Sequence, residues 1–143
     1  MGKKRIVKKG GEGETGSAGR SSARASKRKL EQGRLYVQAT YNNTKVSLAD
    51  TSGNTVAWSS SGSLGFSGAK KGTPFAAAKV GELLGEKALA MGVKEVDVIV
   101  GGVGSGRESS VRAFAGKGIH INSIKDVTPI PHNGPRPPKP RRV

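Results

Sequence analysis

The sequence predicts a single α/β domain in which two main helices cover a mixed sheet of about five strands. Three observations predict this class: apolar residues alternate with a period of two from Leu35, an amphipathic helical pattern follows Pro74, and a β-branched run leads into a glycine-rich turn and a helix start. With 143 residues and no cysteine, the chain fits one domain without disulfides. We expect a flexible arm over residues 1–34, the domain over residues 35–127 and an extended tail over residues 128–143.

The arm is rich in Lys, Arg, Gly and Ser and has almost no large apolar side chain, so it cannot bury enough surface to fold alone. The sequence therefore predicts a basic, disordered segment.

Alternating residues next predict three antiparallel strands. Asn42 and Asn43 predict a tight turn between the first two, because Asn tolerates the left-handed backbone angles that such hairpins demand. The strands are marked by Leu35, Val37, Ala39 and Tyr41, by Val46 and Leu48, and by residues 56–58.

A helix is predicted from Pro74 to about Met91, since Thr73 can cap it and proline suits its first turn. Its apolar stripe comprises Ala76, Val80, Leu83, Leu84, Ala88 and Met91, and its polar side Lys79, Glu82 and Glu86. Gly81 and Gly85 each cost such a helix up to ~1 kcal/mol relative to alanine. They therefore predict a close approach to the sheet or to a partner.

A nearly continuous run of apolar, β-branched residues follows, the pattern of a central strand covered on both faces: Val96, Val98, Ile99 and Val100. Gly101, Gly102, Gly104 and Gly106 then permit unusual backbone angles before a short helix over residues 107–115, whose first amides attract anions. The spacing fits neither nucleotide motif: Arg107 and Glu108 stand where a P-loop has Lys and a hydroxyl, and the GxGxxG pattern is absent. We expect this turn to present amides and Arg107 to some other phosphate.

A fifth strand is predicted from Ile119, and its alternation slips by Ile124. A β-bulge or an edge position would explain the slip.

Beyond Thr128 the chain holds six of its seven prolines, which forbid helix and sheet. An extended proline-rich chain presents its cations to phosphate backbones at low entropic cost. The alternative is a proline-rich ligand for an aromatic groove of another protein.

We also expect Asn133 to convert to isoaspartate. The backbone nitrogen of Gly134 can attack the Asn133 side chain, because glycine offers little steric hindrance. An isoaspartate assay would detect this conversion.

The net charge of +15 is concentrated at the two ends: +8 in residues 1–34, +2 in residues 35–116 and +5 in residues 117–143. A nearly neutral domain with cationic extensions indicates a nucleic-acid partner. An anionic membrane surface is the second possibility, but the extensions lack the interleaved apolar residues that an interfacial helix needs. Without an apolar run long enough to span a bilayer, we expect a cytoplasmic protein.

The sequence offers little for catalysis, metals or cofactors. Asp50 is expected in a turn and Asp97 on the surface of the sheet. The two histidines, His120 and His132, have neither a cysteine nor an obvious acidic partner with which to form a metal site or a catalytic triad. We expect each of them on the surface or in contact with RNA. A metal-dependent nuclease is therefore only the runner-up hypothesis. Most of the aromatic residues are expected in the core, since they form no RNA-stacking sheet motif: Tyr36, Tyr41, Trp58, Phe66, Phe75 and Phe114.

Five motifs, in order along the chain, resemble the family of ribosomal protein eleven of the small subunit. They are YNNT at 41–44, GNTVAWSS at 53–60, GTPFAA at 72–77, GSGRE at 104–108 and DVTPIPHNG at 126–134, followed by RPP at 136–138 and RRV at 141–143. Each motif alone is weak, and their combination is highly specific.

The resemblance implies a ribonuclease-H-like fold that binds RNA without catalysis. It also implies a structural role on the platform of the small ribosomal subunit, where the protein bridges ribosomal RNA helices and helps form the Shine–Dalgarno cleft. Expected partners are small-subunit ribosomal RNA, small-subunit proteins seven and eighteen, initiation factor three and messenger RNA near that cleft.

By this resemblance and by charge, we expect RNA contacts along the first turn, the loop before the first helix, the glycine turn, the second helix and the tail. The residues are Asn42, Asn43, Lys70, Lys71, Ser105, Gly106, Arg107, Arg112, His132, Asn133, Arg136, Lys139, Arg141 and Arg142.

Overall fold

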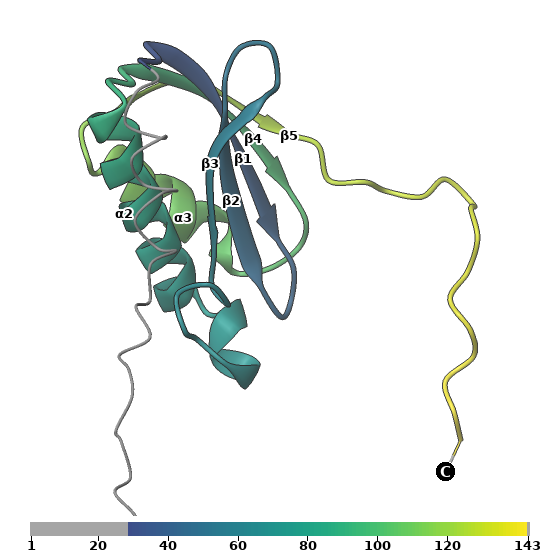
Figure 1. Cartoon of the computed structure of the whole chain (residues 1–143). Coiled ribbons are helices and arrows are strands. Elements are labelled where there is room, and N and C mark those ends of the chain that lie inside the picture. Colours follow the sequence, from purple (N-terminus) through teal and green to yellow (C-terminus); the bar gives the residue numbers. More distant parts are fainter. Residues whose placement is uncertain (1–28, 143) are drawn as a thin grey trace, which may run out of the picture.

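The computed structural model describes residues 29–142, so most of the predicted arm, residues 1–28, lies outside the described part (Figure 1). The elements follow one another as β1 (Gln32–Ala39), β2 (Thr44–Ala49), β3 (Thr55–Ser60), the 3-10 turn η1 (Gly68–Gly72), α2 (Pro74–Ala90), β4 (Glu95–Gly101), α3 (Gly106–Ala115) and β5 (His120–Asp126). The predicted mixed α/β architecture is thus confirmed, with β1 beginning three residues earlier than expected.

The five strands form one sheet in the order β3-β2-β1-β4-β5. β2 is antiparallel to both β1 and β3, whereas β4 is parallel to both β1 and β5. Four strands, β1, β3, β4 and β5, therefore run in one direction, and the segments that follow them start from the same edge of the sheet.

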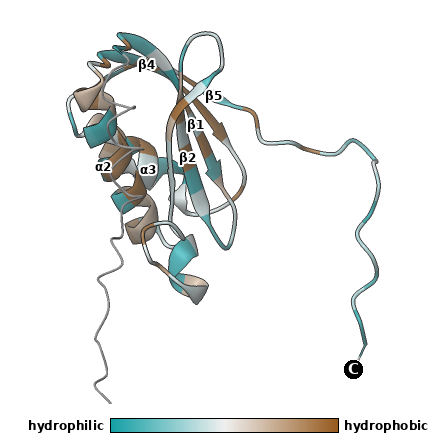
Figure 2. Ribbon diagram, in the orientation of Figure 1, coloured by the Kyte–Doolittle hydropathy of each residue, from teal (hydrophilic) through white to brown (hydrophobic). Residues whose placement is uncertain are grey.

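Both helices cover the same face of the sheet (Figure 1). The core between them contains Leu35, Leu48, Leu84, Val98 and Phe114, all fully buried. Figure 2 shows hydrophobic residues within the two helices and along parts of the strands, and mostly hydrophilic or neutral residues along the tail. The expectation that β4 is covered on both faces is wrong: its residues alternate between buried and half-buried, and Ile99 is one of the half-buried ones on the open face.

The glycines of α2 allow the two helices to pack closely. A Cβ atom at Gly81 would lie 2.3 Å from the Ser110 carbonyl oxygen of α3, and one at Gly85 would lie 2.7 Å from Lys117 Cγ. The close approach is therefore to α3 and to the residues that follow it, so the expectation that these glycines face the sheet or a partner is wrong. At the start of α2, the Thr73 side chain accepts a hydrogen bond from the Ala76 amide at 3.3 Å, which confirms the predicted cap.

β5 lies at an edge of the sheet, and its register with β4 shifts between Val96 and Asp97. Both explanations offered for the slipped alternation are therefore confirmed. In residues 29–142, no helix is long and apolar enough to cross a membrane.

Candidate nucleic-acid interface

Three loops that follow parallel strands meet at one edge of the sheet: residues 40–43 after β1, η1 after β3, and residues 102–105 after β4. We call these three segments the loop cluster. The Ser105 hydroxyl donates a hydrogen bond to the Gly72 carbonyl at 2.8 Å, and the Gly104 amide donates one to the Ala39 carbonyl at 2.9 Å. Hydrogen bonds between residues 33 and 65 positions apart in sequence thus hold the glycine turn against η1 and the end of β1.

Glycine is required where these loops touch. A Cβ atom at Gly72 would lie 2.2 Å from the Tyr41 carbonyl oxygen, and one at Gly102, whose φ is 99°, would lie 2.1 Å from the Ala39 carbonyl oxygen. No side chain fits at such distances. The glycines of this turn therefore allow it to pack against the end of β1 and the first hairpin.

The hairpin of residues 40–43 differs from the prediction in its backbone. Among the described residues, the one non-glycine residue with positive φ is Asn133, so neither Asn42 nor Asn43 adopts the left-handed conformation. The side chain of Thr40 closes the turn instead, because its hydroxyl donates to the Asn43 carbonyl and accepts from the Asn43 amide, each at 3.1 Å. Asn42 is exposed, and the buried Asn43 Oδ1 has no partner in the described chain.

The loop cluster contains Lys70 and Lys71 and no acidic residue. Lys70 is exposed, and both lysines precede the N-terminus of α2, whose first turn has no acidic side chain. A helix start and two cations give this edge a positive potential that suits a phosphate backbone.

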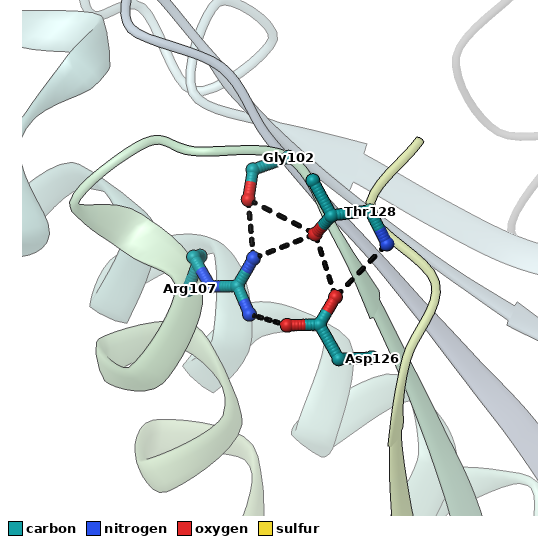
Figure 3. Close-up of polar contacts among 4 residues, drawn as sticks. All are labelled: Gly102, Arg107, Asp126 and Thr128. Carbon is teal, nitrogen blue, oxygen red and sulfur yellow. Dashed lines mark hydrogen bonds and ion pairs between the residues drawn. The ribbon is translucent and has the colours of Figure 1, made fainter. Parts of the chain in front are cut away.

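Arg107 is bound by its own chain (Figure 3). Its guanidinium donates to the Gly102 carbonyl, to Thr128 Oγ1 at 3.0 Å and to the Asp126 carboxylate. We call Gly102, Arg107, Asp126 and Thr128 the tail-root clamp, because it joins the glycine turn to the end of β5, where the tail begins. The structure thus places Arg107 in an internal contact, with its side chain 32% exposed.

The clamp also sets the charge of Asp126. Hydrogen bonds from the Thr128 hydroxyl at 2.6 Å and the Thr128 amide at 2.9 Å, together with the Arg107 guanidinium, lower the pKa of Asp126 to about 2. Each favours the ionised carboxylate. The clamp is therefore fully charged at neutral pH.

The remaining predicted residues divide into two groups. Gly106 is buried, and Arg112 pairs with Glu108 on the exposed side of α3, toward β5. The tail residues are all exposed on a segment without helix or strand that leaves the domain (Figure 1): His132, Asn133, Arg136, Lys139, Arg141 and Arg142.

Exposed aromatic residues are what the sequence reasoning missed. Only Phe114 of the six aromatic residues is buried, whereas Tyr41 is 78%, Phe75 64% and Trp58 55% exposed, so the expectation that most are core is wrong. The helical spacing contained a signal for Phe75, which shares the outer face of α2 with Lys79, Glu82 and Glu86.

The acidic residues occupy structural positions. Asp50 closes the β2–β3 turn by accepting from the Asn54 amide at 2.9 Å, and the hydrogen bonds from Asn54 lower the pKa of Asp50. Asp97, half-buried in β4, accepts from the Ser123 hydroxyl at 2.7 Å. Within residues 29–142, no group of three His, Asp or Glu side chains could hold a metal ion.

Comparison with known proteins decides the family. The model of the family described as Ribosomal protein S11 matches residues 33–142. The chain belongs to the ribosomal protein S11 family. It is 54% identical over 124 residues to the small ribosomal subunit protein uS11 of Solibacter usitatus, an alignment that covers 87% of this chain and 92% of that protein. It is 51% identical over 127 residues to uS11 of Thermosynechococcus vestitus, covering 89% and 98% respectively.

Membership of this family gives the chain a structural, non-enzymatic role in the small ribosomal subunit. The family match begins within β1 and extends through the tail, so it includes the loop cluster, the tail-root clamp and the basic tail.

Proposed function

We propose that the loop cluster and the basic tail bind small-subunit ribosomal RNA at two separate places and so connect RNA helices of the platform. The convergence of three loops, with two lysines and no carboxylate, carries this proposal. Arg136, Lys139, Arg141 and Arg142 supply a second cationic segment beyond the clamp.

In this proposal Asn42, Asn43, Lys70, Lys71 and Ser105 contact RNA at the loop cluster. Arg107 acts by holding the tail root, and Arg112, outside the cluster, reaches a different RNA segment. His132 and Asn133 extend the contact along the tail.

The family resemblance supports the finer assignments that we also propose. The protein lies beside small-subunit proteins seven and eighteen, helps form the cleft where the Shine–Dalgarno region of a messenger pairs, and approaches initiation factor three. It acts in the cytoplasm of a bacterial cell. The strand order β3-β2-β1-β4-β5 supports a ribonuclease-H-like scaffold, and the absence of acidic residues from β1 supports its use without catalysis.

Retention on purified small subunits during high-salt washing tests the proposal. The wild-type chain should pellet with the subunits, and the double substitution Lys70→Gln/Lys71→Gln should release it at a lower salt concentration, since each phosphate contact adds to the salt dependence of binding. Lys87→Gln, an exposed lysine in the last turn of α2, is the matched control and should behave as wild type. Recovery of the wild-type chain only as free protein would contradict the proposal.

A further inference from the structure

An aromatic hollow lies beside the loop cluster, between the end of the β3–η1 segment and the start of α2. Leu64, Phe66, Phe75 and Lys79 line this hollow, whose volume is about 340 Å³. Ligand-binding clefts in proteins have volumes of roughly 300–1,000 Å³, so this hollow lies at the small end of that range. Its lining residues come from the segments on either side of η1, so Lys70 and Lys71 lie between them in the sequence, each four residues from one of the two rings.

The rings of Phe66 and Phe75 lie in an arrangement that can accommodate a third aromatic ring, that of a ligand. Phe66 and Phe75 meet edge to face, with centroids 6.1 Å apart and planes at 85°. A flat ring stacked on one of them would present its own edge or face to the other in a favourable geometry. Phe75 is 64% exposed and adjoins Phe66 and Leu64, so the three form a contiguous apolar group at the surface, which is more typical of a binding site than an isolated exposed ring.

The charges around the hollow select the class of ligand. Lys79 Nζ lies 5.8 Å from the Phe75 centroid, and Lys70 and Lys71 are in the adjoining turn. None of the residues that line the hollow is acidic, and Glu82 is paired with Lys79 at 3.0 Å. If the ligand were an apolar side chain of another protein, the neighbouring lysines would have no role in binding it. A base of a nucleic acid is flanked by a phosphate on each side, and the lysines can contact these phosphates.

We propose that this aromatic hollow binds one unpaired base of RNA by stacking, while Lys70 and Lys71 contact the phosphates that flank it. The inference rests on the proposed RNA-binding function and adds to it a base-stacking subsite that distinguishes single-stranded from duplex RNA. Base stacking on aromatic side chains contributes enough that removal of one ring lowers affinity about five- to hundredfold.

The test compares Phe75→Leu with wild type in the full chain, using fluorescence anisotropy with a short oligoadenylate and with an RNA duplex that has the same number of phosphates. Leucine keeps the apolar side chain but not the ring. We expect the substitution to weaken oligoadenylate binding by about tenfold, to leave duplex binding unchanged and to leave the salt dependence unchanged.

Trp58→Leu is the matched control, because Trp58 is also exposed and also has a lysine near its ring, Lys45 at 6.0 Å, but lies outside the hollow on the open face of the sheet. It should bind both probes as wild type does. Equal losses on both probes, no loss for Phe75→Leu, or the same loss for Trp58→Leu would each overturn the stacking site. If the wild type bound neither probe nor small subunits, the proposed function itself would fail.

Discussion

The guanidinium of Arg107 is held by its own chain on two sides, by the Gly102 carbonyl and by the Asp126 carboxylate (Figure 3). An arginine in a glycine turn predicts a phosphate contact, and its charge alone cannot distinguish that role from an internal one. The partner that decides the question, Asp126, lies 19 residues further along the chain and reaches Arg107 only because β5 pairs with β4. The structure therefore places the Arg107 guanidinium against the residues from which the tail begins.

We predict that Asp126→Asn removes part of the acid sensitivity of the fold. The pKa of Asp126 is about 2 in the folded protein, below its ordinary value of 3.8, so the ionised clamp stabilises the fold above pH 3.8 and loses this effect as the pH falls toward 2. The wild type should therefore lose more thermal stability than Asp126→Asn between pH 5 and pH 2, and the variant should have the lower Tm at neutral pH. Thermal melts followed by circular dichroism at a series of pH values would measure this difference.

Glu108→Gln is the control for that series, because Glu108 and Arg112 form an exposed pair on α3 and such pairs contribute little. If Asp126→Asn lost stability in acid as steeply as the wild type, the clamp would not be the source of the acid sensitivity.

At the level of elements, the packing of α2 on α3 explains two glycines that weaken α2 as an isolated helix. Their positions in the sequence predict a close approach, but only the structure identifies α3 as the neighbour. Both helices lie on one face because the crossovers from β3 to β4 and from β4 to β5 advance across the sheet in the same direction, and right-handed crossovers then share a face. A run of β-branched residues does not show on which face the helices lie, so the run in β4 predicts helices on both faces of the sheet.

The second prediction compares Gly81→Ala with Gly85→Ala. At Gly81 the new methyl group meets the backbone oxygen of Ser110, so the helices must separate, and we expect a loss of about 1–3 kcal/mol of unfolding free energy. At Gly85 it meets Lys117 Cγ at 2.7 Å and Cβ at 3.2 Å, so one side chain has to shift rather than the backbone of α3, and the gain of up to ~1 kcal/mol in helix propensity offsets part of the cost. Urea unfolding of both variants should rank Gly81→Ala as the less stable. The opposite order would mean that α3 shifts without cost.

For the molecule as a whole, the direction of the strands assembles the interface. The chain leaves β1, β3, β4 and β5 at one edge, so the first hairpin, η1, the glycine turn and the tail root all begin there. Sequence patterns identified each of these segments, since turn residues, lysine pairs and prolines are local signals. Their convergence depends on strand order, and the exposed aromatic hollow depends on the path of the loop between Phe66 and Phe75, so neither was predictable from local patterns.

The third prediction separates the tail from the domain. Replacing Arg136, Lys139, Arg141 and Arg142 with glutamine keeps the prolines and the length of the tail while removing four positive charges. These side chains are exposed, so the Tm should not change. RNA binding should become weaker and less dependent on salt, with the slope of log affinity against log salt reduced by up to about 3, since each phosphate contact contributes roughly 0.7–0.9.

Titration of small-subunit RNA at several salt concentrations, with the wild type and the four-glutamine variant in parallel, measures that slope. If the tail instead bound an aromatic groove of another protein, its charges would make no phosphate contacts and their removal would leave the slope for RNA unchanged. The Lys70→Gln/Lys71→Gln variant should lower the slope further when combined with the tail variant, because the two cationic segments contact different phosphates. If the combined variant, with all six substitutions, had the same slope as the tail variant alone, the loop cluster and the tail would not bind RNA independently.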